Sequence, residues 1–356
     1  MPSQTLDQQY MHHALSLAGR GLGRTWPNPS VGCVIVKDAH VIAAARTGDG
    51  GRPHAEAAAL EIAGAQARGA TAYVSLEPCA HHGKTGPCAA ALVAAGVARV
   101  VIACGDPDPR VSGEGVRILS DASIEVIEGV CEQEALALNA GFFKRITQNR
   151  PLVTLKMAVS GDDKIARAGQ RTQISGEAAS RYMHLMRARH DAILVGVNTA
   201  LTDDPMLSAR IDGHEHKIMR CVMDRGLRLP VNARLVQSAG EHSLVIFHAS
   251  GDGAALEAAG ARLVRLDDVT PAVVLASLAE QGITRLMVEG GAQVASSFLN
   301  AGLVDEFHLI RSHADIGADG VDAIAETDLN DALQPFDLKE KSMLGEDVLE
   351  IYAVKG

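Results

Sequence analysis

Short apolar β-type runs alternate with helical segments along the whole chain, and this alternation constrains the possible fold more than any other feature. In the first 150 residues we predict strands at residues 31–36, 41–45, 71–76 and 99–103. We also predict an opening amphipathic helix over residues 8–20, from the helical spacing of Met11, Ala14, Leu15 and Ala18. Strands that alternate with helices fold as a sheet covered by helices, so the sequence predicts the α/β class.

The same pattern restarts after a polar segment near the middle of the chain. A helix predicted over residues 132–145 is followed by residues 147–151, whose polar composition and final proline mark a linker. Further strands are predicted at residues 152–157, 192–195, 221–223, 244–247 and 286–288. A chain of 356 residues also exceeds one ordinary core, since domains usually hold about 100 to 200 residues. We therefore predict two α/β domains, residues 1–147 and 148–356.

Charge and hydropathy exclude several classes of function. The formal net charge of −10, without a concentrated run of Lys and Arg, would repel a phosphate backbone, so no nucleic-acid partner is expected. The N-terminal residues lack a secretion-signal pattern, and no apolar segment reaches about 20 residues, so no membrane association is expected. The six cysteines do not form a disulfide framework in a chain of this length. We expect a cytoplasmic protein whose cysteines serve metal or redox chemistry.

Three soft metal ligands lie near predicted helix starts. His54 opens a helical segment, Cys79 and Cys88 each follow a proline, and Cys88 opens another helix. The free N–H groups and partial positive charge of a helix N-terminus favour the thiolate that zinc requires. One His and two Cys leave the fourth zinc position open for water, which is typical of catalytic sites. The sequence therefore predicts that His54, Cys79 and Cys88 bind a catalytic zinc ion.

Glu56 is the predicted proton carrier of this site. It is two residues from His54, so its carboxylate can face the same cavity without binding the metal. Zinc lowers the pKa of water to about 7, and Glu56 can carry the proton to an amine that leaves an amidine carbon. Alone, a His-x-Glu is usually a solvated helix start and two cysteines nine residues apart are usually unrelated thiols. Together they match the signature of nucleobase and nucleoside deaminases.

Cys79 and Cys88 are separated by a longer loop than the two residues found in many deaminases. With this loop, the chain resembles the bacterial bifunctional deaminase and reductase family of riboflavin biosynthesis over nearly its whole length. The segments that carry the resemblance are residues 27–34, 54–56, 76–88 and 106–107 in the first half, and 191–196, 199, 203–207 and 303–306 in the second.

For the first half, the resemblance implies a cytidine-deaminase-like three-layer α/β/α domain. Its reaction would convert the 2-amino group of 2,5-diamino-6-ribosylamino-4(3H)-pyrimidinone 5′-phosphate to a carbonyl. By resemblance, Asn28 and Lys84 hold this small-molecule substrate and Asp106 lies beside it. Taken alone, Asn28 and Asp106 would be turn residues next to prolines, and Lys84 would be a solvated charge.

The second half contains no Gly-x-Gly-x-x-Gly between a strand and a helix, so an ordinary Rossmann site is not supported. The paired glycines of residues 288–293 could instead expose N–H groups to a pyrophosphate, although such pairs usually form only a tight connection. The resemblance implies a dihydrofolate-reductase-like α/β domain that uses NADPH to reduce the ribosyl group to a ribityl chain. The implied cofactor-binding residues are Ala158, Thr199, Asp203, Gly290, Gly291, Ala292 and Gln293. The implied substrate-binding residues are Arg187, Leu207, Arg210 and Glu289.

Arginine suits a sugar phosphate because its planar donors match phosphate oxygens in pairs, although Arg187 or Arg210 could instead belong to an ion pair. Some positions depart from the family pattern. Thr47 replaces a frequent His and Asp108 a frequent Asn, and in the second half the departures are residues 160–164, 173 and 311–313.

Three alternatives to the bifunctional enzyme therefore stay open. They are a deaminase with a degenerate reductase domain, a nucleoside or tRNA deaminase, and a structural zinc module fused to a degenerate nucleotide-binding domain. For the bifunctional enzyme we expect zinc and NADPH as cofactors and a homo-oligomeric assembly.

Overall fold

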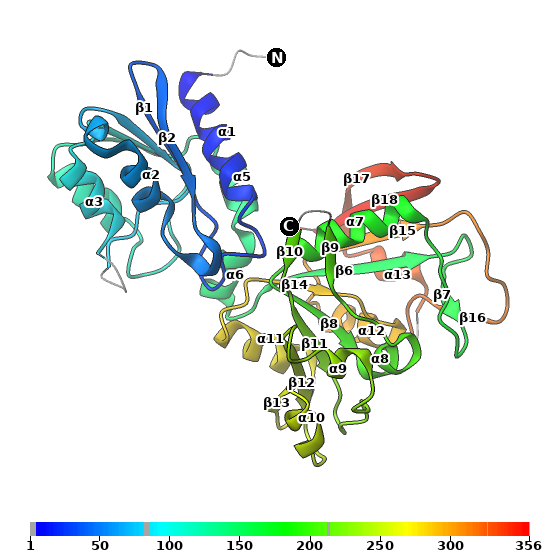
Figure 1. Ribbon diagram of the computed structural model, residues 1–356. Coiled ribbons are helices and arrows are strands. Elements are labelled where there is room, and N and C mark those ends of the chain that lie inside the picture. Colours follow the sequence, from blue (N-terminus) through cyan, green and yellow to red (C-terminus); the bar gives the residue numbers. More distant parts are fainter. Residues whose placement is uncertain (1–4, 82–85, 212–213, 326, 356) are drawn as a thin grey trace. The chain divides into compact units, whose positions relative to one another are not determined.

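The computed structural model describes residues 5–81, 86–211, 214–325 and 327–355. The chain divides into two compact units, Met1–Asn149 and Arg150–Gly356 (Figure 1). Among the described residues, no helix is both long enough and apolar enough to cross a lipid bilayer.

The first unit is built on one five-stranded sheet. Its strands are β1 (Gly32–Lys37), β2 (His40–Arg46), β3 (Thr71–Val74), β4 (Arg99–Ile102) and β5 (Glu125–Ile127). Their order is β2-β1-β3-β4-β5, in which β1 is antiparallel to β2 and β3, while β3, β4 and β5 are parallel. All four strands predicted for this half are present, with ends that differ by two residues or fewer.

Helices cover both faces of this sheet, which confirms the three-layer α/β/α arrangement. They are α1 (Leu6–Gly19), α2 (Ala55–Ala63), α3 (Cys88–Ala95), α4 (Glu114–Asp121), α5 (Glu132–Leu138) and α6 (Ala140–Gln148), and two short 3₁₀ turns lie at Asp49–Gly51 and Gly64–Ala67. Figure 1 shows α1 and α5 on one face, and α2 and α3 on the other. α1 begins with a capping box, because Thr5 and Gln8 each accept the other's backbone N–H.

The prediction of a single helix over residues 132–145 is wrong, because the helix is interrupted at Asn139 (φ −97°, ψ 15°), which separates α5 from α6. Asn139 is buried, and its side-chain amide pairs with the backbone of Ser30. The Ser30 N–H donates to Oδ1 at 3.1 Å, and Nδ2 donates to the Ser30 carbonyl at 3.1 Å. This pair fixes the loop that precedes β1 against the start of α6.

The second unit is built on a nine-stranded sheet with the order β13-β12-β11-β8-β14-β6-β15-β18-β17. The strands of this unit are β6 (Leu152–Val159), β7 (Lys164–Arg167), β8 (Ala192–Gly196), β9 (Ala209–Ile211), β10 (His214–His216), β11 (Met219–Met223), β12 (Leu244–His248), β13 (Arg262–Arg265), β14 (Arg285–Val288), β15 (Glu306–Arg311), β16 (Gly320–Asp322), β17 (Phe336–Leu344) and β18 (Asp347–Val354). From β13 to β15 the neighbours in the sheet are parallel, and β18 and β17 are added antiparallel. β9 with β10, and β7 with β16, form two small antiparallel pairs.

The five strands predicted for this half are confirmed as β6, β8, β11, β12 and β14, and they are adjacent in the middle of the sheet. Every residue of β8 and β12 is buried, as expected for parallel strands covered on both faces. The helices of this unit are α7 (Glu177–Ala188), α8 (Val197–Asp203), α9 (Arg234–Gln237), α10 (Ala254–Ala258), α11 (Pro271–Glu280), α12 (Ala292–Asn300) and α13 (Leu329–Leu333).

Replacement of Asn139 should test its structural role. Asn139→Ala leaves a buried N–H and a buried carbonyl of Ser30 without their partners, and each such loss costs about 1 to 3 kcal/mol. We expect the first unit to lose about 2 to 4 kcal/mol of unfolding free energy, measured by urea denaturation. The exposed Gln133 of α5 provides the control, since Gln133→Ala should change stability by less than about 0.5 kcal/mol. Equal stability of the two variants would contradict this role.

Candidate active sites of the two units

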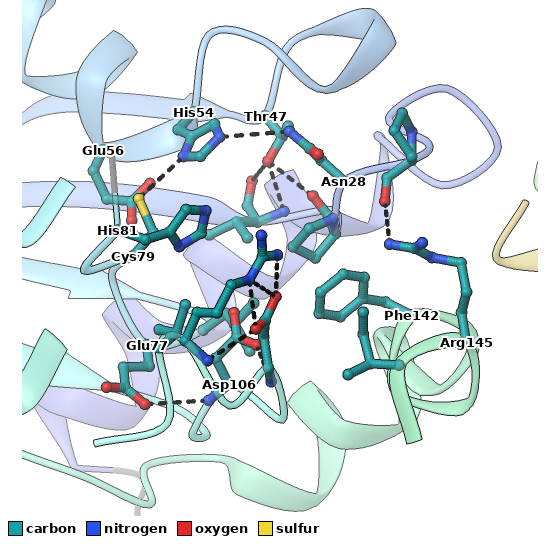
Figure 2. Close-up of a pocket in the computed structure, with 18 of the residues that line it drawn as sticks. Asn28, Thr47, His54, Glu56, Glu77, Cys79, His81, Asp106, Phe142 and Arg145 are labelled. Atoms are coloured by element: carbon teal, nitrogen blue, oxygen red, sulfur yellow. Dashed lines mark hydrogen bonds and ion pairs between the residues drawn. The ribbon is translucent and has the colours of Figure 1, made fainter. Parts of the chain in front are cut away.

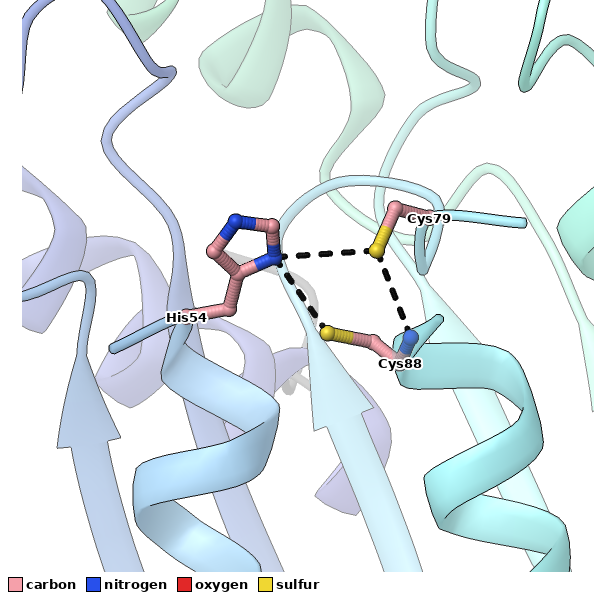
Figure 3. Close-up of side chains that lie close together, drawn as sticks. All are labelled: His54, Cys79 and Cys88. Carbon is pink, nitrogen blue, oxygen red and sulfur yellow. Dashed lines mark hydrogen bonds between the residues drawn. The ribbon is translucent and has the colours of Figure 1, made fainter. Parts of the chain in front are cut away.

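The three predicted zinc ligands converge beside the starts of two helices. His54 directly precedes α2, Cys88 is the first residue of α3, and Cys79 lies in the loop after β3. The Nδ1 atom of His54 is 3.6 Å from the Cys79 Sγ and 3.3 Å from the Cys88 Sγ (Figure 3). Nitrogen and sulfur ligands of one tetrahedral zinc ion are expected about 3.5 Å apart, given metal bonds of about 2.0 and 2.3 Å. The donor set and its spacing therefore fit zinc.

Backbone and side-chain groups favour the thiolate form of Cys79. The backbone N–H of Cys88 donates to the Cys79 Sγ at 3.3 Å. Hydrogen bonds from Cys88 and from His54 lower the pKa of Cys79 to about 4, although burial acts in the opposite direction. A thiolate at neutral pH is the form that binds a metal.

Glu56 lies in the first turn of α2, is only 4% exposed, and has its carboxylate beside Cys79 (Figure 2). Burial, together with the negative charge of Cys79, raises the pKa of Glu56 to about 7. Its carboxylate does not belong to the group of ligand atoms, those of His54, Cys79 and Cys88, that lie within 4.8 Å of one another. A carboxyl that gains and loses a proton near neutral pH is suited to general acid and base catalysis.

These residues border a pocket of about 120 Å³. Asn28, His54, Glu56, Cys79 and Asp106 line it, and Cys88 is not a lining residue but lies 3.3 Å from His54. Lys84 lies outside the described residues. Figure 2 shows Phe142 and Arg145 of α6 on the side of the pocket away from Glu56.

The loop that carries Asn28 is held from several sides. Asn28 Nδ2 donates to the Gly51 carbonyl at 2.9 Å and lies 3.5 Å from His54 Nε2. Thr47, which departs from the family pattern, is buried; its hydroxyl accepts from the Val31 N–H at 2.9 Å and donates to the Pro29 carbonyl at 3.2 Å. At this position a threonine therefore serves as a support for the loop.

Glu77 is an important residue that the sequence analysis did not single out, although it precedes Pro78 in a recognised segment. It is buried, and its carboxylate accepts N–H bonds from Asp106 at 3.3 Å, Gly113 at 3.1 Å and Gly115 at 3.0 Å. It thus fixes the Asp106 loop and the start of α4 beside Cys79. A second residue that was missed is His81, a pocket residue whose Nδ1 is buried and has no hydrogen-bond partner among the described residues.

In the second unit, the predicted cofactor-binding segments gather at the carboxyl ends of the parallel strands β6, β8 and β14. The Gly291 N–H donates to the Thr199 hydroxyl at 3.1 Å, and Asn198 Nδ2 donates to Gln293 Oε1 at 3.1 Å, so α8 and the start of α12 are in contact. A Cβ on Gly290 would lie 2.8 Å from the Cβ of Val294, so this turn requires glycine. Ala158 is near the end of β6, Asp203 ends α8, and Ala292 begins α12.

The predicted substrate-binding residues of this unit form a buried ion pair beside an exposed arginine. Arg187 donates to Glu289 through Nε and Nη2, both at 2.7 Å, and its Nη1 donates to the Ser208 carbonyl at 3.0 Å. Arg210 is exposed and contacts His184 at 3.1 Å, and Leu207 is buried with a φ of 51°. Lys156, which the sequence analysis missed, is close to both members of the ion pair, and burial lowers its pKa.

Two of the departures in the second half are in direct contact. Asp163 occupies a left-handed conformation (φ 57°) in the turn before β7, and Arg311 ends β15. Arg311 Nη1 lies 2.6 Å from Asp163 Oδ1, and Arg311 Nε donates to Glu350 at 3.0 Å. The turn before β7 and the end of β15 are therefore joined by an ion pair.

Because the carboxyl group of Asp106 is buried, we predict that its ionisation lowers the stability of the fold. Burial raises the pKa of Asp106 from 3.8 to about 6, so the folded protein holds this proton more tightly than the unfolded chain does. Ionisation of Asp106 therefore destabilises the fold above pH 6, and the cost is lost as the pH falls from 6 towards 3.8.

Asp106→Asn should remove this cost. We expect the variant to exceed the parent protein in unfolding free energy by about 1 to 3 kcal/mol near pH 8, and by much less near pH 4. Urea titrations at the two pH values measure the difference. A stability gain that is the same at both would show that ionisation of Asp106 is not its source.

Comparisons with known proteins match both units. The cytidine and deoxycytidylate deaminase zinc-binding region matches residues 4–104, and the RibD C-terminal domain matches residues 151–349. The riboflavin biosynthesis protein RibD of Aquifex aeolicus is 41% identical over 84% of this chain and 85% of its own. Acinetobacter baumannii RibD has a solved structure with a TM-score of 0.89 and 37% identity, covering 98% of this chain and 99% of that one.

A structure from Thermotoga maritima has a TM-score of 0.88 and 33% identity, and covers 98% of this chain and 99% of its own. It is described as a diaminohydroxyphosphoribosylaminopyrimidine deaminase and 5-amino-6-(5-phosphoribosylamino)uracil reductase. Family models and full-length relatives thus agree with the two units and with the His-Cys-Cys cluster. The chain belongs to the RibD family of bifunctional riboflavin biosynthesis proteins, with a zinc-binding deaminase domain followed by a reductase domain.

Proposed function

We propose that the first domain, residues 1–147, deaminates 2,5-diamino-6-ribosylamino-4(3H)-pyrimidinone 5′-phosphate, and that the second, residues 148–356, reduces the deaminated product with NADPH. One observation carries the deaminase proposal, namely the buried carboxylate of Glu56 in the same pocket as His54 and Cys79. His54, Cys79 and Cys88 would hold zinc, which when bound supplies a Lewis acid that activates water at neutral pH. Glu56 moves a proton from this water to the departing amine.

The pocket residues suit a polar ring with an attached sugar phosphate. Asn28 offers an amide and Asp106 a carboxyl to the ring edge, and both line the pocket. His81 Nδ1 is buried without a partner among the described residues, so a ligand group at this atom would relieve its desolvation. Lys84 and the pocket arginines, Arg52, Arg110 and Arg145, bring positive charge for the phosphate.

In the reductase domain, the cofactor would lie along the carboxyl ends of the parallel strands, between Ala158, Thr199, Asp203 and residues 290–293. Crevices at this edge of a parallel sheet commonly bind nucleotides, and a nicotinamide cofactor supplies hydride for the ribosyl carbon. Arg187 holds the carboxylate of Glu289 in one orientation through two hydrogen bonds. Leu207 forms an apolar wall, and the exposed Arg210 binds the substrate phosphate.

We also propose that the enzyme acts in the cytoplasm, because a reducing compartment keeps Cys79 and Cys88 as the thiols that zinc binding needs. The homo-oligomeric assembly stays a prediction.

Glu56→Gln tests the deaminase mechanism. The amide has nearly the shape of the carboxyl but cannot carry the proton, so we expect deamination to fall by about 10² to 10⁴-fold while zinc content stays at the parent level. Ammonia release and metal analysis measure the two effects. Reduction of the already deaminated substrate should be unchanged. Undiminished ammonia release would refute the role of Glu56, and loss of zinc would make it a ligand.

Mass spectrometry of the products from the diaminopyrimidine, with and without NADPH, tests the order of the two reactions. We expect only the deaminated ribosyl compound without NADPH, and the ribityl compound when NADPH is present. A protein with a degenerate reductase would give the ribosyl compound in both cases. A nucleoside or tRNA deaminase would release ammonia from those substrates and not from the pyrimidine.

Arg210→Gln tests phosphate binding in the reductase. Loss of a charge-assisted contact worth about 1.5 to 3 kcal/mol should raise the KM for the reductase substrate by about 10- to 100-fold, with little change in kcat. The KM of deamination should not change. Arg181→Gln is the control, since Arg181 is exposed on the same unit and pairs with Glu177 on α7. An unchanged reductase KM in Arg210→Gln would exclude this contact.

A further inference from the structure

The deaminase domain carries a second group of possible metal ligands, which the proposed reactions do not use. His12 lies in α1, Cys131 directly precedes α5, and Glu134 lies in the first turn of α5. The Nε2 atom of His12 is 3.0 Å from Glu134 Oε1 and 3.6 Å from Cys131 Sγ. All three ligand atoms lie within 4.8 Å of one another.

The geometry of this group resembles that of the first one. Its nitrogen–sulfur distance of 3.6 Å is the same as that between His54 and Cys79. An imidazole, a thiol and a carboxylate are ligands for zinc and related divalent transition metals, whereas calcium and magnesium prefer oxygen ligands alone. The donor set therefore selects the chemical class of the ion.

The second group is separate from the candidate zinc site. α1 and α5 cover one face of the five-stranded sheet, while the helices beside His54 and Cys88 cover the other (Figure 1). An ion at the second group would therefore lie across the sheet from the deaminase pocket. It would be an additional ion and not a part of the reaction centre.

Partial exposure decides what kind of site this is. The His12 side chain is 32% exposed and that of Glu134 is 59% exposed. Three protein ligands leave the remaining position of a tetrahedral ion to water. Such a site is open to exchange with the solvent and binds more weakly than a closed structural site.

We propose that His12, Cys131 and Glu134 form an auxiliary, exchangeable site for a divalent transition metal of the zinc class. The ion would join α1 to α5 across 119 residues of sequence. Both elements also support Ser30, because the Ser30 hydroxyl donates to the Ala18 carbonyl at 2.6 Å and Asn139 follows α5. Metal binding therefore holds together α1 and α5, which support the loop that carries Asn28. It also raises the thermal unfolding midpoint of the deaminase domain.

Cobalt titration of the full-length, zinc-loaded protein tests the proposal. Co²⁺ is the probe because a cobalt–thiolate bond gives a charge-transfer absorption band in the near ultraviolet, whereas zinc is spectroscopically silent. We expect a second equivalent of metal to bind with this band, and the unfolding midpoint to rise with it. His12→Gln and Cys131→Ser should each weaken this binding by at least ten-fold and abolish the rise, and Glu134→Gln should weaken it by a smaller factor.

His13→Gln is the matched control, because His13 is the exposed neighbour of His12 and does not belong to the group. It should bind the second equivalent as the parent protein does. Retained ammonia release shows that each variant is folded, since none of these residues lines the deaminase pocket. The proposal is overturned if the zinc-loaded protein binds no cobalt with the thiolate band, or if the band persists in both His12→Gln and Cys131→Ser.

Discussion

The buried carboxylate of Glu77 holds together the parts of the deaminase site that come from different segments. Its oxygens accept the N–H groups of Asp106, Gly113 and Gly115, and those of Asp106 and Gly115 would otherwise be buried without partners. Because Glu77 is two residues from Cys79, the same interaction links a zinc ligand to the Asp106 loop and to α4. A Cβ on Gly115 would lie 2.1 Å from the Pro78 carbonyl, so this junction has no spare volume.

The deaminase pocket holds several carboxyl groups in buried positions, although carboxyl groups prefer contact with water. Glu56, Glu77 and Asp106 are all buried around one cavity, and burial raises the pKa of Glu56 to about 7 and of Asp106 to about 6. Glu77 accepts backbone N–H bonds from Asp106, Gly113 and Gly115. The groups available for chemistry are thus the ones that the fold leaves incompletely solvated, as expected where a site is organised for reaction and not for stability.

The sequence alone predicts the structural features that depend on a local pattern of residues. The candidate zinc ligands follow from residue types near helix starts, and the five central strands of the second sheet follow from continuous apolar runs. The strands on either side of these five were missed, and one of them, β17, is mostly exposed and lacks such a run. The break at Asn139 could not be predicted, since its partner Ser30 is 109 residues away. Likewise, Asp163 and Arg311 each look like an isolated departure until the fold brings them together.

The last helix of the first domain, α6, forms one wall of the deaminase pocket. Phe142, Arg145 and Ile146 of α6 line the cavity, although the zinc-binding region matched by the family model stops at residue 104. A gene fragment cut shortly after the candidate metal ligands would therefore lack one wall of this pocket. During synthesis on the ribosome, the candidate metal ligands likewise emerge well before α6, so this wall of the pocket is completed last.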